Sequence, residues 1–141
     1  MPKENNLQRF LDAQQGDYQT ALAEIKAGRK RSHWMWYIFP QIQGLGFSSM
    51  AQHYAITNAA EAAEYLRHPV LGSRLVEIAK ALLPLSGSNA TSIMGSPDDV
   101  KLKSSMTLFA QVPGASQVFE QVLAKFFGGV PDSKTLQLLG K

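Results

Sequence analysis

Apolar residues recur at helical spacing along almost the whole chain, in short segments that single Gly or Pro residues separate. The clearest stripe consists of Tyr18, Ala21, Leu22 and Ile25. Positions i, i+3, i+4 and i+7 lie on one face of an α-helix, so this spacing predicts a helix with one buried side. The same spacing occurs in residues 7–11, 59–66, 71–82, 97–109, 119–126 and 132–139.

Residues 33–39 are apolar or aromatic at nearly every position, which is typical of a buried strand and also fits a helix. We favour the helix, because a strand needs a partner and no other segment combines β-branched enrichment with flanking turn residues. The sequence therefore predicts an all-α fold, a compact single-domain bundle of about seven or eight short helices.

Residues with capping preferences mark several expected helix boundaries. Gly16 is expected to close a first helix and Asp17 to cap the next, so that the first 28 residues form a helical hairpin. Asn58, followed by Glu61, is expected to cap the helix over residues 59–66. At residues 96–97, Ser and Pro are expected to supply the N-cap and first-turn proline of the helix that follows.

Length and composition limit the class of protein. A chain of 141 residues is expected to form one globular domain over residues 1–141, with residues 1–6 as a flexible N-terminus. Hydrophobic residues make up 45% and charged residues 18%, which is typical of a folded chain. With no cysteine there can be no disulfide, thiolate metal site or cysteine nucleophile, and we expect a cytoplasmic protein without a cofactor.

The sequence lacks the features typical of a membrane-spanning segment, a nucleic-acid-binding surface or a metal site. The longest apolar run, residues 34–39, is far shorter than the roughly 20 residues that span a bilayer. A net charge of +3 is too small for a typical nucleic-acid-binding surface. His33, His53 and His68 lack the spacing of metal ligands on a helix, so no metal site is predicted.

Three segments concentrate residues that can bind or react. Arg and Lys at residues 29–31 run directly into His33, Trp34 and Trp36, a combination that can bind an anion and stack on a planar ligand. The alternative interpretation makes both tryptophans core residues and the basic run a solvated helix end, and we favour it for Trp34. Residues 40–49 contain Gly44 and Gly46, which suit close ligand approach or, more simply, an interhelical turn capped by Ser48.

The third segment is residues 98–107. Lys101 and Ser104 lie within one helical turn, so a lysine-activated serine is conceivable, although small residues here more commonly permit close helix packing.

Four stretches of the chain form a recognisable pattern: HWMWYIFPQ at residues 33–41 with GLG at residues 44–46, which is the most specific, and further stretches in residues 51–56, 65–72 and 98–109. In these stretches the sequence closely resembles the mainly bacterial domain of unknown function 1810 family. Tyr37 departs from the family pattern, which commonly has phenylalanine there. The resemblance implies a small all-helical domain but brings no established activity and no catalytic residues. Some members are named calpastatin-like, yet an inhibitor of that type is a disordered repeat protein, which this apolar and unrepeated chain does not resemble.

The leading functional hypothesis is a polar-rimmed pocket for a small anionic or nucleotide-like metabolite, in which polar groups gather beside aromatic rings. Its expected residues are His33, Trp36, Gln41, Tyr54, Lys101 and Ser104. If the protein is an enzyme, His33 is the candidate acid or base and Lys101 the candidate anion stabiliser. The alternative is a protein-interaction module, homo-oligomer included, that uses exposed aromatic residues at 34–39.

Overall fold

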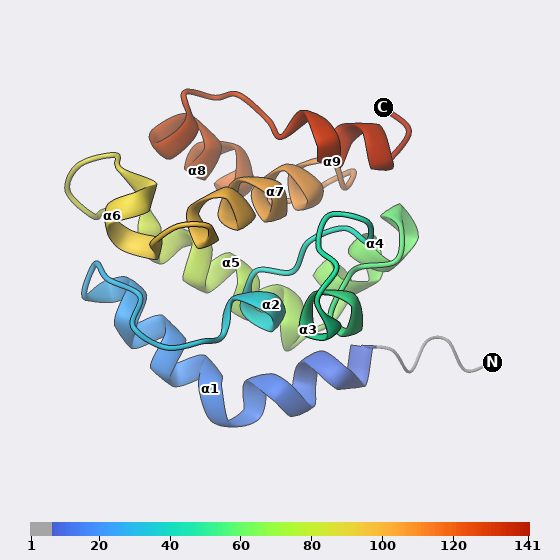
Figure 1. Ribbon diagram of the computed structural model, residues 1–141, viewed down its shortest axis with the longest axis horizontal. Helices are drawn as coiled ribbons and strands as arrows, with labels where there is room; N and C mark the ends of the chain where they lie inside the picture. Colours follow the sequence, from blue (N-terminus) through green and yellow to red (C-terminus); the bar gives the residue numbers. More distant parts are fainter. Residues whose placement is uncertain (1–6) are drawn as a thin grey trace.

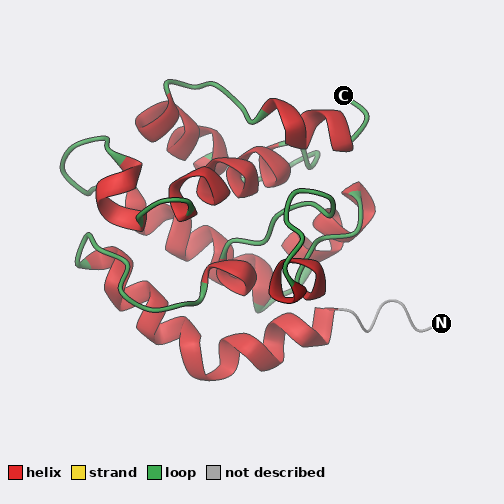
Figure 2. Cartoon of the chain, in the orientation of Figure 1, coloured by secondary structure: helices red, strands yellow, loops and turns green. Residues whose placement is uncertain are grey.

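The computed structural model describes residues 7–141, which form nine helices and no strand. The all-α prediction is confirmed, and Figures 1 and 2 show the helices packed around one another and joined by loops. The helices are α1 (Gln8–Lys26), α2 (Met35–Ile38), α3 (Ser49–His53), α4 (Ala59–Arg67), α5 (Leu71–Leu82), α6 (Ala90–Met94), α7 (Asp98–Ala110), α8 (Val118–Phe127) and α9 (Ser133–Leu138). The expected flexible segment 1–6 lies outside the described residues.

Two helices organise the core. Helix α5 packs against α1, α4 and α8, and helix α7 packs against α4, α6, α8 and α9. Aromatic rings connect α7 to α4 and α1: Tyr65 of α4 lies 5.1 Å from Phe10 of α1 and 5.3 Å from Phe109 of α7, measured between ring centroids. All three side chains are fully buried, so α1, α4 and α7 are joined through one hydrophobic cluster.

Helix α1 is a single helix, so the predicted helical hairpin is wrong. Gly16 lies inside α1 without a positive φ angle, and the αL conformation that ends the helix comes only at Gly28, with φ +83°. Asp17 therefore caps no helix; its carboxylate accepts a hydrogen bond from the Tyr37 hydroxyl. The buried face continues across Gly16 from Phe10 to Ile25, which stabilises the helix on both sides of the glycine. Figure 1 shows α1 bending part-way along its length.

The short segments explain why the helices number nine. The predicted helix in residues 33–39 is confirmed as the single turn α2. Fusing the first two expected helices removes one from the count, while α3 and α6, of five residues each, add two. These two helices are too short to show an apolar stripe in the sequence.

The predicted N-caps have mixed outcomes. Asn58 Oδ1 accepts a hydrogen bond from Glu61 N at 2.9 Å, and Glu61 Oε1 accepts one from Thr57 N at 2.7 Å, which confirms the expected capping pair. Ser96 does not cap α7, because the residue before this helix is Pro97 and Asp99 Oδ1 accepts from the first-turn Val100 N instead. Among residues 7–141, no helix is both long enough and apolar enough to cross a membrane.

Candidate functional site

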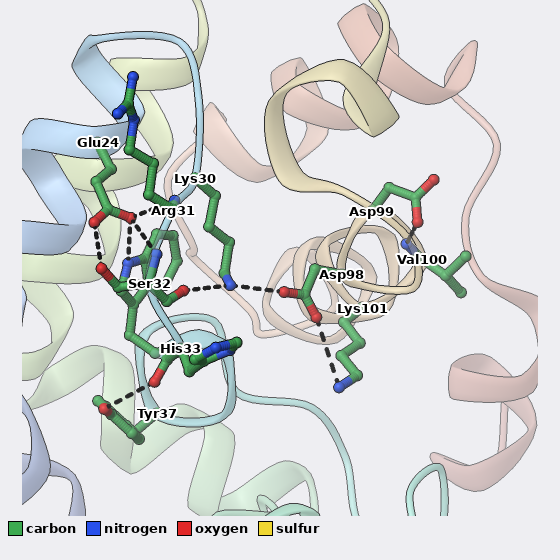
Figure 3. A network of polar contacts seen from close by, with 11 residues as sticks. Glu24, Lys30, Arg31, Ser32, His33, Tyr37, Asp98, Asp99, Val100 and Lys101 are labelled. Atoms are coloured by element: carbon green, nitrogen blue, oxygen red, sulfur yellow. Dashed lines mark hydrogen bonds and ion pairs between the residues drawn. The ribbon is translucent and has the colours of Figure 1, made fainter.

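The loop between α1 and α2 is held by one carboxylate. Glu24 accepts hydrogen bonds from Arg31 N at 2.7 Å, Ser32 N at 3.0 Å, Ser32 Oγ at 2.6 Å and Trp34 Nε1 at 2.9 Å. Burial favours a higher pKa for Glu24, but these hydrogen bonds outweigh it and lower the pKa to about 2. The carboxylate therefore stays ionised and holds the loop, and with it Trp34, in one conformation (Figure 3).

The same loop is joined to α7 by an ionic cluster that consists of Lys30, Asp98 and Lys101. Lys30 Nζ lies 2.8 Å from Asp98 Oδ2, and Lys101 Nζ lies 3.7 Å from Asp98 Oδ1. Two ammonium groups thus share one carboxylate, which leaves one positive charge uncompensated within the cluster. Figure 3 shows Asp99 directed to the opposite side of α7, where it bonds Val100 N, so it does not neutralise this charge.

The two lysines of the cluster differ in how completely they are bonded. Lys30 Nζ also donates to Ser32 O at 2.6 Å and lies 5.0 Å from the Trp34 ring centroid, and its side chain is only 7% exposed. Lys101 Nζ lies 5.4 Å from the Trp36 ring centroid, and its side chain is 26% exposed. Within the described part of the chain Lys101 donates no hydrogen bond, so its ammonium group can still bind an acceptor.

The predicted site residues Trp36, Gln41 and Tyr54 lie together. They line a narrow recess of about 20 Å³, which has room for a single water molecule. Lys101 is joined to this group through its contact with the Trp36 ring. The structure thus brings four of the six predicted residues into one region, although their function stays a prediction.

The other two predicted residues lie elsewhere. The His33 side chain is exposed on the surface, and its backbone carbonyl accepts a long hydrogen bond of 3.4 Å from the Tyr37 hydroxyl. Ser104 is 2% exposed, and its hydroxyl donates to Val100 O at 3.2 Å within α7. Neither side chain lines the recess beside Trp36.

A wider cleft adjoins the recess and shares Gln43, Gly44, Gly46, Gln52 and Ala55 with it. The cleft has a volume of about 570 Å³ and lies between the start of α1, the loop before α3, and the chain after α3. Its further lining residues are Arg9, Phe47, His53 and Thr57. Residues 40–49 do form the predicted turn, with Ser48 Oγ accepting from Ala51 N at 3.1 Å, and the turn also forms one wall of this cleft.

The six predicted site residues do not include Arg9, Phe47 or His53, which line the cleft. Arg9 Nε donates to His53 O and Arg9 Nη2 donates to Ala55 O, each at 2.7 Å, and Arg9 Nη1 lies 3.5 Å from Glu61 Oε2. These bonds join segments more than forty residues apart, so no local spacing signals them. For Phe47, the sequence signal is an aromatic residue directly after two closely spaced glycines, Gly44 and Gly46.

The aromatic surface on which the interaction-module hypothesis depends is not present. Trp34 is 1% exposed, and the structure also buries Met35, Tyr37, Ile38 and Phe39. Only Trp36 is partly exposed, because the single turn of α2 inserts its other side chains into the core. Trp34 is therefore a core residue, as favoured from the sequence, while homo-oligomerisation stays a prediction.

Residues 4–139 of the sequence match a family described as a protein of unknown function, DUF1810. The chain belongs to this family. The predicted family membership is thus confirmed, and the DUF1810 match covers the α2 segment, the cleft and α7 alike. No curated protein matches the sequence.

A solved structure is similar to this DUF1810 protein along almost its entire length. It is the crystal structure of the conserved hypothetical protein Rv1873 from Mycobacterium tuberculosis, with 46% sequence identity and a TM-score of 0.94. The similarity covers 96% of this chain and 97% of that chain.

Proposed function

We propose that this DUF1810 protein binds a small anionic, nucleotide-like metabolite beside Trp36, with Lys101 as the principal ligand for the anionic group. The observation that supports this proposal is the state of the Lys101 ammonium group. It lies over the Trp36 ring, donates no hydrogen bond within the described residues, and belongs to a cluster with one uncompensated positive charge.

The chemistry of the site suits a phosphate or carboxylate. A charged oxygen acceptor would give the Lys101 ammonium group a hydrogen bond, and such charge-assisted bonds are about twice as strong as neutral ones. Lys30 and Asp98 stay in place as a fixed pair, because Lys30 is nearly buried and bonded to Ser32 O. The partly exposed Trp36 ring offers a face or edge for a planar part of the ligand.

Binding is the function that the geometry supports, and a reaction requires more groups than the cluster supplies. His33, the predicted acid or base, lies three residues before Trp36 on the surface, and Ser104 is buried and bonded to its own helix.

Thermal unfolding measured against a panel of nucleoside monophosphates, sugar phosphates and carboxylates tests the proposal. A ligand at 100 times its dissociation constant adds about 2.7 kcal/mol of stability, a rise in Tm of roughly 5 to 10 °C for a chain of this size. We expect a selective rise with at least one anion, reduced by added salt and lost in Lys101→Met, which keeps the apolar stem and removes the charge.

Lys125→Met is the matched control, because Lys125 also lies over an aromatic ring, at 5.3 Å from the Phe126 centroid, but has no carboxylate partner among residues 7–141. This variant should bind the ligand as the unmodified protein does. A panel that produces no rise in Tm, or a rise that Lys101→Met retains, would refute binding at this cluster.

A further inference from the structure

We infer that the 570 Å³ cleft beside α3 is a second binding site, which takes a neutral planar ring with amide-like hydrogen-bonding groups, such as the base of a nucleoside. This inference goes beyond the anion site at Lys101, since it depends on different residues and a different kind of ligand. The volume lies within the range of roughly 300 to 1,000 Å³ that small-molecule sites occupy.

The charges in the cleft favour a neutral ligand. Among the described residues that line the cleft, only Arg9 has a permanent charge, and its guanidinium is bonded to the carbonyls of His53 and Ala55 and paired with Glu61. The ion pair is mostly buried, with side-chain exposures of 14% for Arg9 and 9% for Glu61. Displacing these partners to bind an anion would leave a nearly buried carboxylate unpaired, which costs several kcal/mol in general.

Neutral hydrogen-bonding groups surround the mouth of the cleft. The Gln43 carboxamide is exposed and makes no hydrogen bond to any described residue. Gln52 donates its Nε2 to Phe47 O at 2.8 Å, and its Oε1 accepts no bond within residues 7–141. A carboxamide can donate and accept at once along one edge, which is how Gln pairs with the edge of a base. The Thr57 side chain adds a hydroxyl at the same cleft.

Phe47 provides a surface on which a planar ring can stack. Its side chain is 79% exposed, the highest exposure of any large apolar residue in the described chain. Aromatic stacking of a base is tolerant of the identity of the base, because every base presents a π face. A flat ring bound at Gln43 and Gln52 would therefore have an apolar partner at the rim.

The loop that carries Phe47 packs against both α9 and α3. These contacts fix the loop in a conformation that exposes the Phe47 side chain. Gly44, with φ +106°, packs so closely that an added Cβ would lie 3.2 Å from Leu138 Cδ2 of α9. At Gly46 an added Cβ would lie 2.7 Å from Ala51 Cβ of α3. Together with the Gln52 bond to Phe47 O, these contacts preorganise the cleft and reduce the entropy lost on binding.

Titration with uncharged nucleosides, followed by ligand-observed NMR, tests the inference. We expect saturable binding of at least one of adenosine, guanosine, cytidine and uridine, with the strongest saturation transfer to the protons of the base. Phe47→Ala should weaken binding roughly 5- to 150-fold, the effect of removing one stacked ring, while Phe47→Trp should retain it. Gln43→Ala should also weaken binding without changing Tm, since its side chain is exposed.

Val130→Ala is the control for loss of an exposed apolar side chain, because Val130 is 55% exposed and does not line the cleft. It should leave nucleoside binding unchanged. The inference is wrong if no nucleoside binds, if Phe47→Ala and Gln43→Ala bind normally, or if glucose binds in place of the nucleosides. It is equally wrong if only phosphorylated nucleosides bind and Lys101→Met alone abolishes binding, an outcome that would still support the anion site.

Discussion

Several single side chains in this protein form hydrogen bonds that join segments lying outside one common helix. Glu24 is the clearest case, because one carboxylate accepts four hydrogen bonds from residues 31–34 and so determines the path of the loop into α2. That path places Lys30 against Asp98 and thereby assembles the ionic cluster beside Trp36. The geometry of the proposed anion site therefore depends on a residue that does not line it.

Replacing Glu24 by Gln should destabilise the protein by about 1 to 3 kcal/mol at pH 7, since hydrogen bonds to a charged acceptor are the strong ones. The pKa of Glu24 is lowered to about 2 from an ordinary value near 4.5, so its contribution is complete above about pH 4.5 and is lost as the pH falls toward 2. Urea unfolding at several pH values measures this difference.

The difference in the free energy of unfolding between the unmodified protein and Glu24→Gln should become smaller as the pH falls from 4.5 to 2. Glu64→Gln, at an exposed position of α4, is the control and should change stability by less than about 0.5 kcal/mol. A gap that stays constant across this pH range would contradict the role given to the Glu24 carboxylate.

At the scale of elements, α1 is one continuous helix, and this continuity determines how α5 and α2 pack against it. A helix that ended at Gly16 would have let residues 7–15 and 17–26 pack separately, whereas the continuous α1 presents one face to both α5 and α2. It also carries Arg9 at one end and Glu24 near the other. The proposed cleft and the loop before α2 are therefore linked through one helix.

Gly16→Ala tests that continuity directly. An alanine in a helix interior is about 0.5 to 1 kcal/mol more favourable than glycine, and an added Cβ at Gly16 would meet nothing within 4 Å. We therefore expect a higher Tm and a higher urea midpoint. In a helical hairpin Gly16 would adopt a positive φ, and the same substitution would lower both values.

At the scale of the whole molecule, buried phenol groups connect the N-terminal helix to the rest of the core. The Tyr18 hydroxyl donates to Glu77 Oε1 and also lies 3.0 Å from Arg74 O, and the Tyr37 hydroxyl donates to Asp17. The Tyr65 hydroxyl accepts from Gln14 Nε2 at 3.0 Å. Burial is the main cause that raises the pKa of all three phenols above the ordinary value of 10.

These three tyrosines should make the protein sensitive to alkali. Because the pKa of each phenol is higher in the folded state, the stability they contribute is complete below about pH 10 and is lost as the pH rises further. As the pH rises, we expect the absorbance of their ionised phenols at 295 nm to increase at the same pH at which the helical circular dichroism is lost. In urea all tyrosines should titrate near pH 10, and full titration near pH 10 with helix content intact would contradict the burial of these phenols.

The sequence by itself determined the features that depend on neighbours along the chain. Apolar spacing identified the all-α class, and local capping identified the helix starts at Asn58 and Ser48, because in each case a side chain bonds a backbone amide three residues away. The family motif around Trp36 likewise lies in one continuous stretch, so it could be recognised without a structure.

Only the tertiary structure decided the features that depend on distant segments. A glycine such as Gly16 can stand at the end of a helix or inside one. Here it lies inside α1, because buried residues before and after Gly16 pack on the same side of one continuous helix. Arg9 borders the cleft because it bonds the carbonyls of residues 53 and 55, and the proposed anion site depends on Lys30 and Lys101 both lying against Asp98. Such contacts form when helices pack together through their buried surfaces, so the spacing of residues along the chain does not predict them.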